Sequence, residues 1–156
     1  MDQSGYGKKK LAAGRAWGVA VHESFSSVVA YVVEASVSKD GTPKLHSVTA
    51  GVHCNLAVNP KSVEAQVQGG ALMGLSMCLP GAAITLKDGV VEQSNFGDFP
   101  VPRITDMPQV AVHIVPSAEP PTGMGEPGLP PLAPAFANAV AQLTGKTPRE
   151  LPFKLG

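Results

Sequence analysis

The sequence predicts a mixed α+β fold in which antiparallel hairpins pack against two main helices. Runs of small and β-branched residues bounded by glycine-containing turns indicate strands, whereas two longer segments repeat apolar residues at helical spacing. The length of 156 residues suits one domain. Its 17 glycines and 15 prolines indicate a loop-rich protein rather than a helical bundle.

The first half of the chain contains the signals of a β-hairpin. Residues 14–38 are rich in β-branched residues and indicate one or two strands. Lys39-Asp40-Gly41 supplies turn chemistry, and residues 45–52 form the returning strand. We expect four polar side chains on the outer faces of this hairpin, namely Glu34, Ser36, His46 and Thr49.

The next segment predicts a helix from about Pro60 to Leu79. Asn59 can cap free backbone amides, and Pro60 suits the first helical position because it lacks an amide hydrogen. Apolar residues recur at intervals of four and form one stripe, comprising Val63, Val67, Ala71, Leu75 and Leu79.

Three glycines in this helix require an explanation. Gly69, Gly70 and Gly74 would each cost roughly 1 kcal/mol relative to alanine in an exposed helix. Some group is therefore expected to approach their face closely. Tight helix–sheet packing is one explanation and close approach of a cofactor is another, and both can hold together.

The second half of the chain begins with a short hairpin. Asp88-Gly89 lies between two apolar runs and supplies the positive φ angles of a primed turn. Residues 95–108 lack periodicity and predict a long ordered loop, followed by a strand over residues 110–115. A final helix is expected from about Pro131 to Leu143, with Gly145 as its terminator.

Charge and hydropathy exclude several partners. Twelve basic and twelve acidic residues leave no net charge, and the basic residues form no patch, so nucleic acid is not expected. The uncharged run over residues 66–86 nearly has the length of a membrane span, but Pro80-Gly81 breaks it. Residues 1–13 are expected to be a disordered or tag-like segment and residues 14–156 a single domain. A cytoplasmic and a periplasmic location both stay open.

The sequence offers no protein-ligated metal site. Cys54 and Cys78 lack Cys-x-x-Cys spacing, so the chain predicts neither a zinc ribbon nor an iron–sulfur cluster. The histidines lack His-x-His spacing, and adjacent His53 and Cys54 would point to opposite faces of a strand. A serine nucleophile elbow and a dinucleotide fingerprint are missing as well.

Glu126 is the candidate catalytic residue. It lies within Gly-Met-Gly-Glu-Pro-Gly, residues 123–128, where the glycines permit close approach of a ligand and Pro127 restricts the backbone. A carboxylate in such a loop, just before a helix, is well placed to abstract a proton. The alternative on spacing alone is an ordinary solvated glutamate.

Four stretches of the chain resemble one known family. They are Val-His-Cys-Asn-Leu-Ala-Val-Asn-Pro (52–60), Gln-Val-Gln-Gly-Gly-Ala-Leu-Met-Gly-Leu (66–75), Val-Glu-Gln-Ser-Asn-Phe (91–96) and Gly-Glu-Pro-Gly-Leu-Pro-Pro-Leu-Ala-Pro (125–134). In order and spacing they resemble the molybdenum-cofactor-binding large subunits of the xanthine dehydrogenase/aldehyde oxidase family. The branch with isoquinoline 1-oxidoreductase beta subunits and related aldehyde dehydrogenases is most similar. Each stretch alone is weak evidence, whereas the four together are specific.

This resemblance implies the C-terminal part of a molybdenum-cofactor-binding domain. Family members are hydroxylases that oxidise an aldehyde or N-heterocycle with oxygen taken from water. The resemblance assigns Glu126 as the base that deprotonates the metal-bound hydroxyl group. It assigns Gln66 to hydrogen-bonding of the molybdenum–pterin cofactor, and the backbone at Gly69, Gly70 and Gly125 to close approach. The metal itself is held by the pterin and not by protein ligands.

The resemblance also implies partners. Family large subunits are several times longer, so we expect the remaining large-subunit polypeptide and an iron–sulfur subunit with two [2Fe–2S] clusters as partners. Alone, the chain is expected to lack the cofactor and to be inactive. The alternative is a free-standing, non-catalytic partner-binding or assembly domain derived from the family, whose glycine-rich helix contacts protein instead of pterin.

Overall fold

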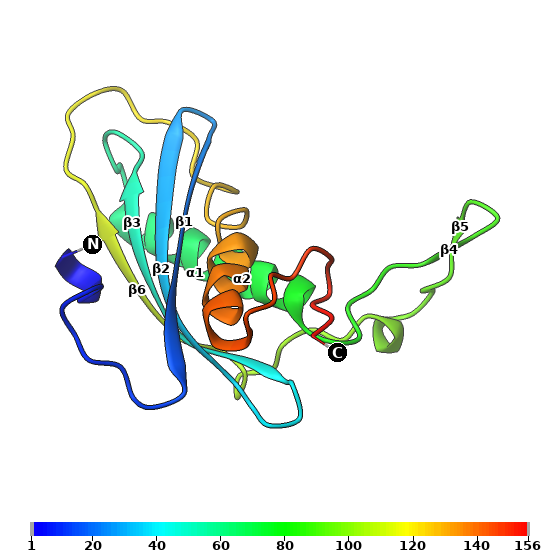
Figure 1. The fold of residues 1–156 in the computed structure, drawn as a ribbon. Helices are drawn as coiled ribbons and strands as arrows, with labels where there is room; N and C mark the ends of the chain where they lie inside the picture. Colours follow the sequence, from blue (N-terminus) through cyan, green and yellow to red (C-terminus); the bar gives the residue numbers. More distant parts are fainter. Residues whose placement is uncertain (1, 156) are drawn as a thin grey trace.

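The computed structural model describes residues 2–155. Met1, the start of the expected N-terminal segment, and Gly156, the end of the expected single domain, lie outside the described residues. A four-stranded sheet in the order β1-β2-β3-β6 forms the centre of the fold (Figure 1). The first three strands are antiparallel and the last is parallel to β3. Their bounds are β1 Arg15–Ser24, β2 Ser27–Val37, β3 Pro43–His53 and β6 Gln109–Ile114.

Both helices lie on one face of this sheet, α1 at Pro60–Cys78 and α2 at Leu132–Thr144 (Figure 1). The expected α+β class, with antiparallel hairpins and two main helices, is therefore confirmed. The parallel pairing of β3 with β6 is an addition to the expected hairpins. It makes the chain between these strands, including α1, a crossover connection.

The core lies between the sheet and the helices. Alternate residues of β2 point toward the helices, and Val29, Tyr31 and Val33 are fully buried there. Phe136 of α2 and Val67 of α1 are equally buried in the same apolar cluster. Gly18 in β1 allows α2 to lie close, since a Cβ atom there would meet the Ala135 carbonyl oxygen at 1.9 Å.

Helix α1 begins as the sequence predicts. The Asn59 side chain accepts a hydrogen bond from the Ser62 amide, and Pro60 follows the cap. Gly70 and Gly74 do pack tightly, but their neighbours are residues 128–132 just before and at the start of α2, and not the sheet. Tight packing at Gly70 and Gly74 was expected against the sheet, and this expectation was wrong, because the packing is against residues 128–132. Gly69 faces open space.

The adjacent glycines Gly69 and Gly70 give a matched pair of substitutions. We expect Gly69→Ala to stabilise the chain by roughly 0.5–1 kcal/mol, because alanine favours a helix and no atom obstructs the new methyl group. Gly70→Ala should destabilise it by roughly 1–3 kcal/mol, because its Cβ would lie 3.0 Å from the Gly128 carbonyl carbon. Urea unfolding of both variants measures the difference. Equal effects at the two positions would contradict the packing described.

The N-terminal segment lies across the opposite face of the sheet. It contains a 3-10 helix, η1 Asp2–Ser4. The ring of Tyr6 contacts that of Trp17 edge-on, with centroids 6.2 Å apart. The boundary proposed between residues 13 and 14 stays a prediction. Tyr6 and Lys9, which precede it, contact residues of the sheet.

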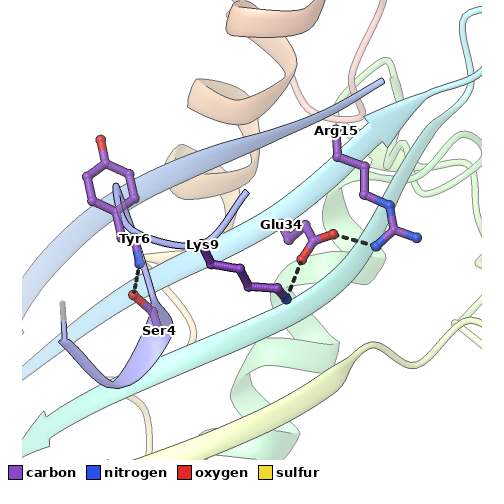
Figure 2. A network of polar contacts seen from close by, with 5 residues as sticks. All are labelled: Ser4, Tyr6, Lys9, Arg15 and Glu34. Atoms are coloured by element: carbon purple, nitrogen blue, oxygen red, sulfur yellow. Dashed lines mark hydrogen bonds and ion pairs between the residues drawn. The ribbon is translucent and has the colours of Figure 1, made fainter. Parts of the chain in front are cut away.

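Glu34 is buried by this segment instead of facing solvent on the outer side of the hairpin. It is 5% exposed. Figure 2 shows the Arg15 guanidinium and the Lys9 ammonium group approaching its carboxylate from two sides, the latter at 3.8 Å. Two cations thus compensate a carboxylate that has been removed from water.

Residues 80–107 form an arm that projects from the end of α1 (Figure 1). Its tip is the expected hairpin, β4 Leu86–Lys87 and β5 Val90–Val91, with φ angles of 52° at Asp88 and 80° at Gly89. A capped 3-10 helix, η2 Phe96–Asp98, follows. Large apolar side chains are exposed along the arm, namely Ile84, Leu86, Val90, Val91, Phe96, Val101, Ile104 and Met107.

Candidate functional site

The loop between β6 and α2 carries Glu126. Three backbone contacts fasten its first half to the chain after β3 and to the β1–β2 turn. The Leu56 amide donates to the Glu119 carbonyl oxygen at 3.0 Å, and the Thr122 amide donates to that of Cys54 at 3.2 Å. The Gly123 amide donates to the Phe25 carbonyl oxygen at 3.2 Å. The loop therefore has a defined path up to the glycine-rich stretch.

Tyr31 holds the other end of this stretch. Its hydroxyl group donates to the Gly128 carbonyl oxygen at 2.5 Å, with the Val67 carbonyl oxygen at 3.3 Å. Gly128 is required here because an added Cβ would lie 3.1 Å from both the tyrosine oxygen and the Val67 Cα atom. Burial raises the pKa of Tyr31 above its usual value of 10.0, so the hydroxyl group stays a donor.

Gln66 and the Glu126 loop meet directly. The Gln66 side-chain amide donates to the Gly125 carbonyl oxygen at 3.2 Å. Glu126 comes next in the chain, its side chain exposed, and its carbonyl oxygen accepts a hydrogen bond from the Leu129 amide at 2.9 Å. An amide side chain on α1 is therefore bonded to the residue before Glu126, in a loop whose backbone is held on both sides of the carboxylate-bearing residue.

The other candidate residues lie along the same part of α1. Gly69 is exposed with open space at its Cα, whereas Gly70 packs against the Gly128–Leu129 peptide. The structure thus brings Gln66, Gly70 and Gly125 to one loop–helix junction with Glu126 beside it. Of the two candidate glycines on the helix, Gly69 and Gly70, only Gly69 leaves room for an external group.

Two features of this junction suit the close approach of an external group, such as the pterin that the resemblance implies. The Gln66 amide keeps a second N–H and its carbonyl oxygen for a ligand, in addition to the bond to Gly125. Gly69, three residues later on α1, has no side chain, and no atom from outside the helix lies within 4 Å of the place that its Cβ would occupy. Gln66, Gly69 and Gly125 would hold such a group, which supplies the redox chemistry when bound.

Residues 2–155 contain no group of three side chains suited to holding a metal ion. Burial raises the pKa of Cys78 to about 12 and also raises that of Cys54, so both thiols stay protonated near neutral pH. His46 bonds to Ser36 at 2.8 Å, and its pKa is lowered chiefly by burial and then by the charge of Arg15. Within the same residues, no helix is long and apolar enough to cross a membrane.

The sequence reasoning missed the residues that fasten the loop. Tyr31 stands among buried apolar residues of β2 and carries a hydroxyl group. Because a buried hydroxyl group needs a hydrogen-bond partner, the sequence could have predicted that Tyr31 anchors another segment. The bond between the Ser27 and Thr122 hydroxyl groups, 2.7 Å long, joins residues 95 positions apart and has no such signal.

Removal of the Tyr31 hydroxyl group tests the anchor at Gly128. We expect Tyr31→Phe to lower the free energy of unfolding by about 1–2 kcal/mol, because a buried carbonyl oxygen loses its partner. Because the pKa of Tyr31 is raised in the folded chain, its hydroxyl group contributes fully to the free energy of unfolding below pH 10.0. This contribution is lost as the pH rises above that value, and the variant lacks this pH dependence. Urea unfolding at neutral and alkaline pH measures both effects. Tyr6→Phe is the control, since it keeps the ring contact with Trp17.

Comparison with known proteins places the chain in a family. It belongs to the molybdopterin cofactor-binding domain family, whose family model matches residues 6–108. That range contains the first three strands, α1 and the arm, and it ends before the loop that carries Glu126.

Individual relatives extend the similarity. The chain is 33% identical over 142 residues to isoquinoline 1-oxidoreductase subunit beta of Brevundimonas diminuta, covering 90% of this chain and 18% of that protein. It is 37% identical over 102 residues to a putative xanthine dehydrogenase molybdenum-binding subunit of Escherichia coli K12, covering 62% of this chain and 14% of that protein.

A solved structure has the same fold. The crystal structure of a Cu,Mo-CO dehydrogenase matches with a TM-score of 0.65 and 26% identity, over 76% of this chain and 16% of that one. The chain thus spans less than a fifth of the length of each of these three proteins.

Proposed function

We propose that the chain is the C-terminal part of the large subunit of a molybdenum hydroxylase. The reaction converts a C–H bond of an aldehyde or N-heterocycle into C–OH with oxygen from water. Two electrons pass to an iron–sulfur partner and two protons are released. The direct bond between Gln66 on α1 and the backbone of the Glu126 loop is the observation that carries the proposal.

Glu126 acts as the base. Its carboxylate is exposed, while the backbone on both sides is held through Gly125 and Leu129. A carboxylate on a fixed backbone accepts the proton of the attacking hydroxyl group without first reorganising the loop. General-base catalysis by a positioned carboxylate contributes about 10²- to 10⁴-fold in rate.

Gln66 has two tasks. One N–H of its amide fixes Gly125, and its remaining polar atoms orient the pterin. Gly69 and Gly125 let the cofactor approach the backbone because neither carries a side chain. All these groups are on the surface of the chain or at its edge, so the remaining large-subunit polypeptide must supply the opposite wall and exclude water. The isolated chain is inactive for that reason.

The arm supports a partner of this kind. Monomeric proteins rarely expose a contiguous set of large apolar side chains, and such a set marks an interaction surface. Phe96 is 98% exposed and Ile104 is 91% exposed. We assign the arm to contact with the remaining large-subunit polypeptide, because the relatives contain more than four-fifths of their length outside the matched part.

Replacement of the base tests the proposal. In the complete enzyme, Glu126→Gln should lower kcat by about 10²- to 10⁴-fold, since the amide cannot accept the proton, while cofactor content stays at the wild-type level. Steady-state kinetics and metal analysis measure the two quantities. Glu119→Gln, an exposed glutamate earlier in the same loop, is the control. Wild-type turnover in Glu126→Gln would remove the catalytic role.

Substitutions in the arm test the partner. Phe96→Asp and Ile104→Asp should leave the melting temperature of the isolated chain unchanged, because both side chains are already exposed. Binding to the co-expressed remaining large-subunit polypeptide should fall at least tenfold, because a charge would enter an apolar interface. Size-exclusion chromatography and calorimetry measure assembly, with Phe96→Leu as the apolar control. Unchanged affinity in both aspartate variants would contradict the assignment.

The alternative is a free-standing assembly domain without catalysis. The exposed arm is compatible with it as well. The two proposals differ at Glu126, because an assembly domain would tolerate its replacement. A chain that binds the partner through its arm but shows no effect of Glu126→Gln would favour the alternative.

A further inference from the structure

The turn between β1 and β2 has an unusual composition. Ser24 pairs with Ser27, which leaves a two-residue loop of Phe25 and Ser26 with φ angles of 52° and 58°. Two positive φ angles define a type I′ turn, for which Asn-Gly is the favoured sequence. A phenylalanine in this conformation is strained, and strained backbone is retained most often where function requires it.

Phe25 touches the segment that leads to Glu126. Its side chain is 62% exposed, so burial of the ring does not explain its presence. Its Cβ atom lies so close to Gly123 that a Cβ added there would be 2.8 Å away. The Gly123 amide also donates to the Phe25 carbonyl oxygen at 3.2 Å. The turn and the loop therefore contact through both backbone and side chain.

This contact occurs at the first of the two glycines that precede Glu126. Gly123 and Gly125 lack the side chains that narrow the backbone angles of other residues. Downstream, the Glu126 backbone is held by Gln66 through Gly125 and by Tyr31 through Gly128. Between the two glycines, Met124 packs against the apolar core. Upstream, Phe25 contacts Gly123 itself.

We propose that Phe25 is a positioning residue for Glu126, which acts by limiting the motion of Gly123 and so of the loop that carries the carboxylate. This inference rests on the proposed function. The strain of the turn is the cost of placing a large side chain at a position where glycine would fit more easily. Ser26, the neighbouring residue with a positive φ angle, serves as a matched control, because the atoms nearest to a Cβ at Gly123 all belong to Phe25.

The first test uses the isolated chain and needs no cofactor. Phe25→Gly and Ser26→Gly each remove one strained side chain, so neither should lower the melting temperature. In ¹⁵N relaxation measurements, Phe25→Gly should lower the backbone order parameters of Gly123, Gly125 and Glu126, whereas Ser26→Gly should leave them unchanged. Identical order parameters in the two variants would overturn the proposal.

A double-mutant cycle tests the contact itself. Gly123→Ala should destabilise the wild-type chain, since its methyl group would meet the Phe25 side chain, and should cost much less in the Phe25→Gly background. Equal costs in both backgrounds would show that the two residues do not interact and would overturn the proposal.

The last test links position to catalysis. In the complete enzyme, Phe25→Gly should lower kcat about tenfold with little change in KM, and Ser26→Gly should retain wild-type kcat. Wild-type kcat in Phe25→Gly would contradict a positioning role. Wild-type turnover in Glu126→Gln would instead remove the proposed function, while the relaxation comparison would still decide whether Phe25 orders the loop.

Discussion

The packing of the glycine face of α1 against the start of α2 is the constraint on which the rest of the structure depends. Gly70 and Gly74 let residues 128–132 approach the helix backbone to about the limit that atoms permit. This approach brings the Gly125 carbonyl oxygen within reach of Gln66 and turns the chain into α2. A side chain at either glycine would separate the two halves of the site, because close-packed interiors cannot yield without loss elsewhere.

The candidate site has a rigid backbone and exposed side chains. Tyr31 and Gln66 each bond to a carbonyl oxygen of the loop, and Phe25 adds a contact at its upstream end. The Glu126 side chain itself is exposed. Such a design suits half of an interface that is completed by another polypeptide, because the backbone is organised before assembly and only side chains adjust afterwards.

Local signals allowed much of the fold to be predicted. Asn59-Pro60 and Asp88-Gly89 specify a helix start and a primed turn through their own backbone chemistry, and both predictions were confirmed. The partner of the helix glycines and the burial of Glu34 were mispredicted, because each depends on residues far away in sequence. Likewise, spacing alone could not show that Gln66 bonds to a residue 59 positions later. The catalytic role of Glu126 stays a prediction.

The arm is an excursion within the crossover from β3 to β6. It leaves after α1 and returns to the start of β6 (Figure 1). Leu79 and Asp106, close to the two ends of the arm, line one pocket. Its strands β4 and β5 pair with each other in a separate two-stranded sheet and not with the central sheet. The arm can therefore lengthen, shorten or change sequence during evolution without disturbing the domain, and a short linker in its place would give a trimmed domain for biophysical work.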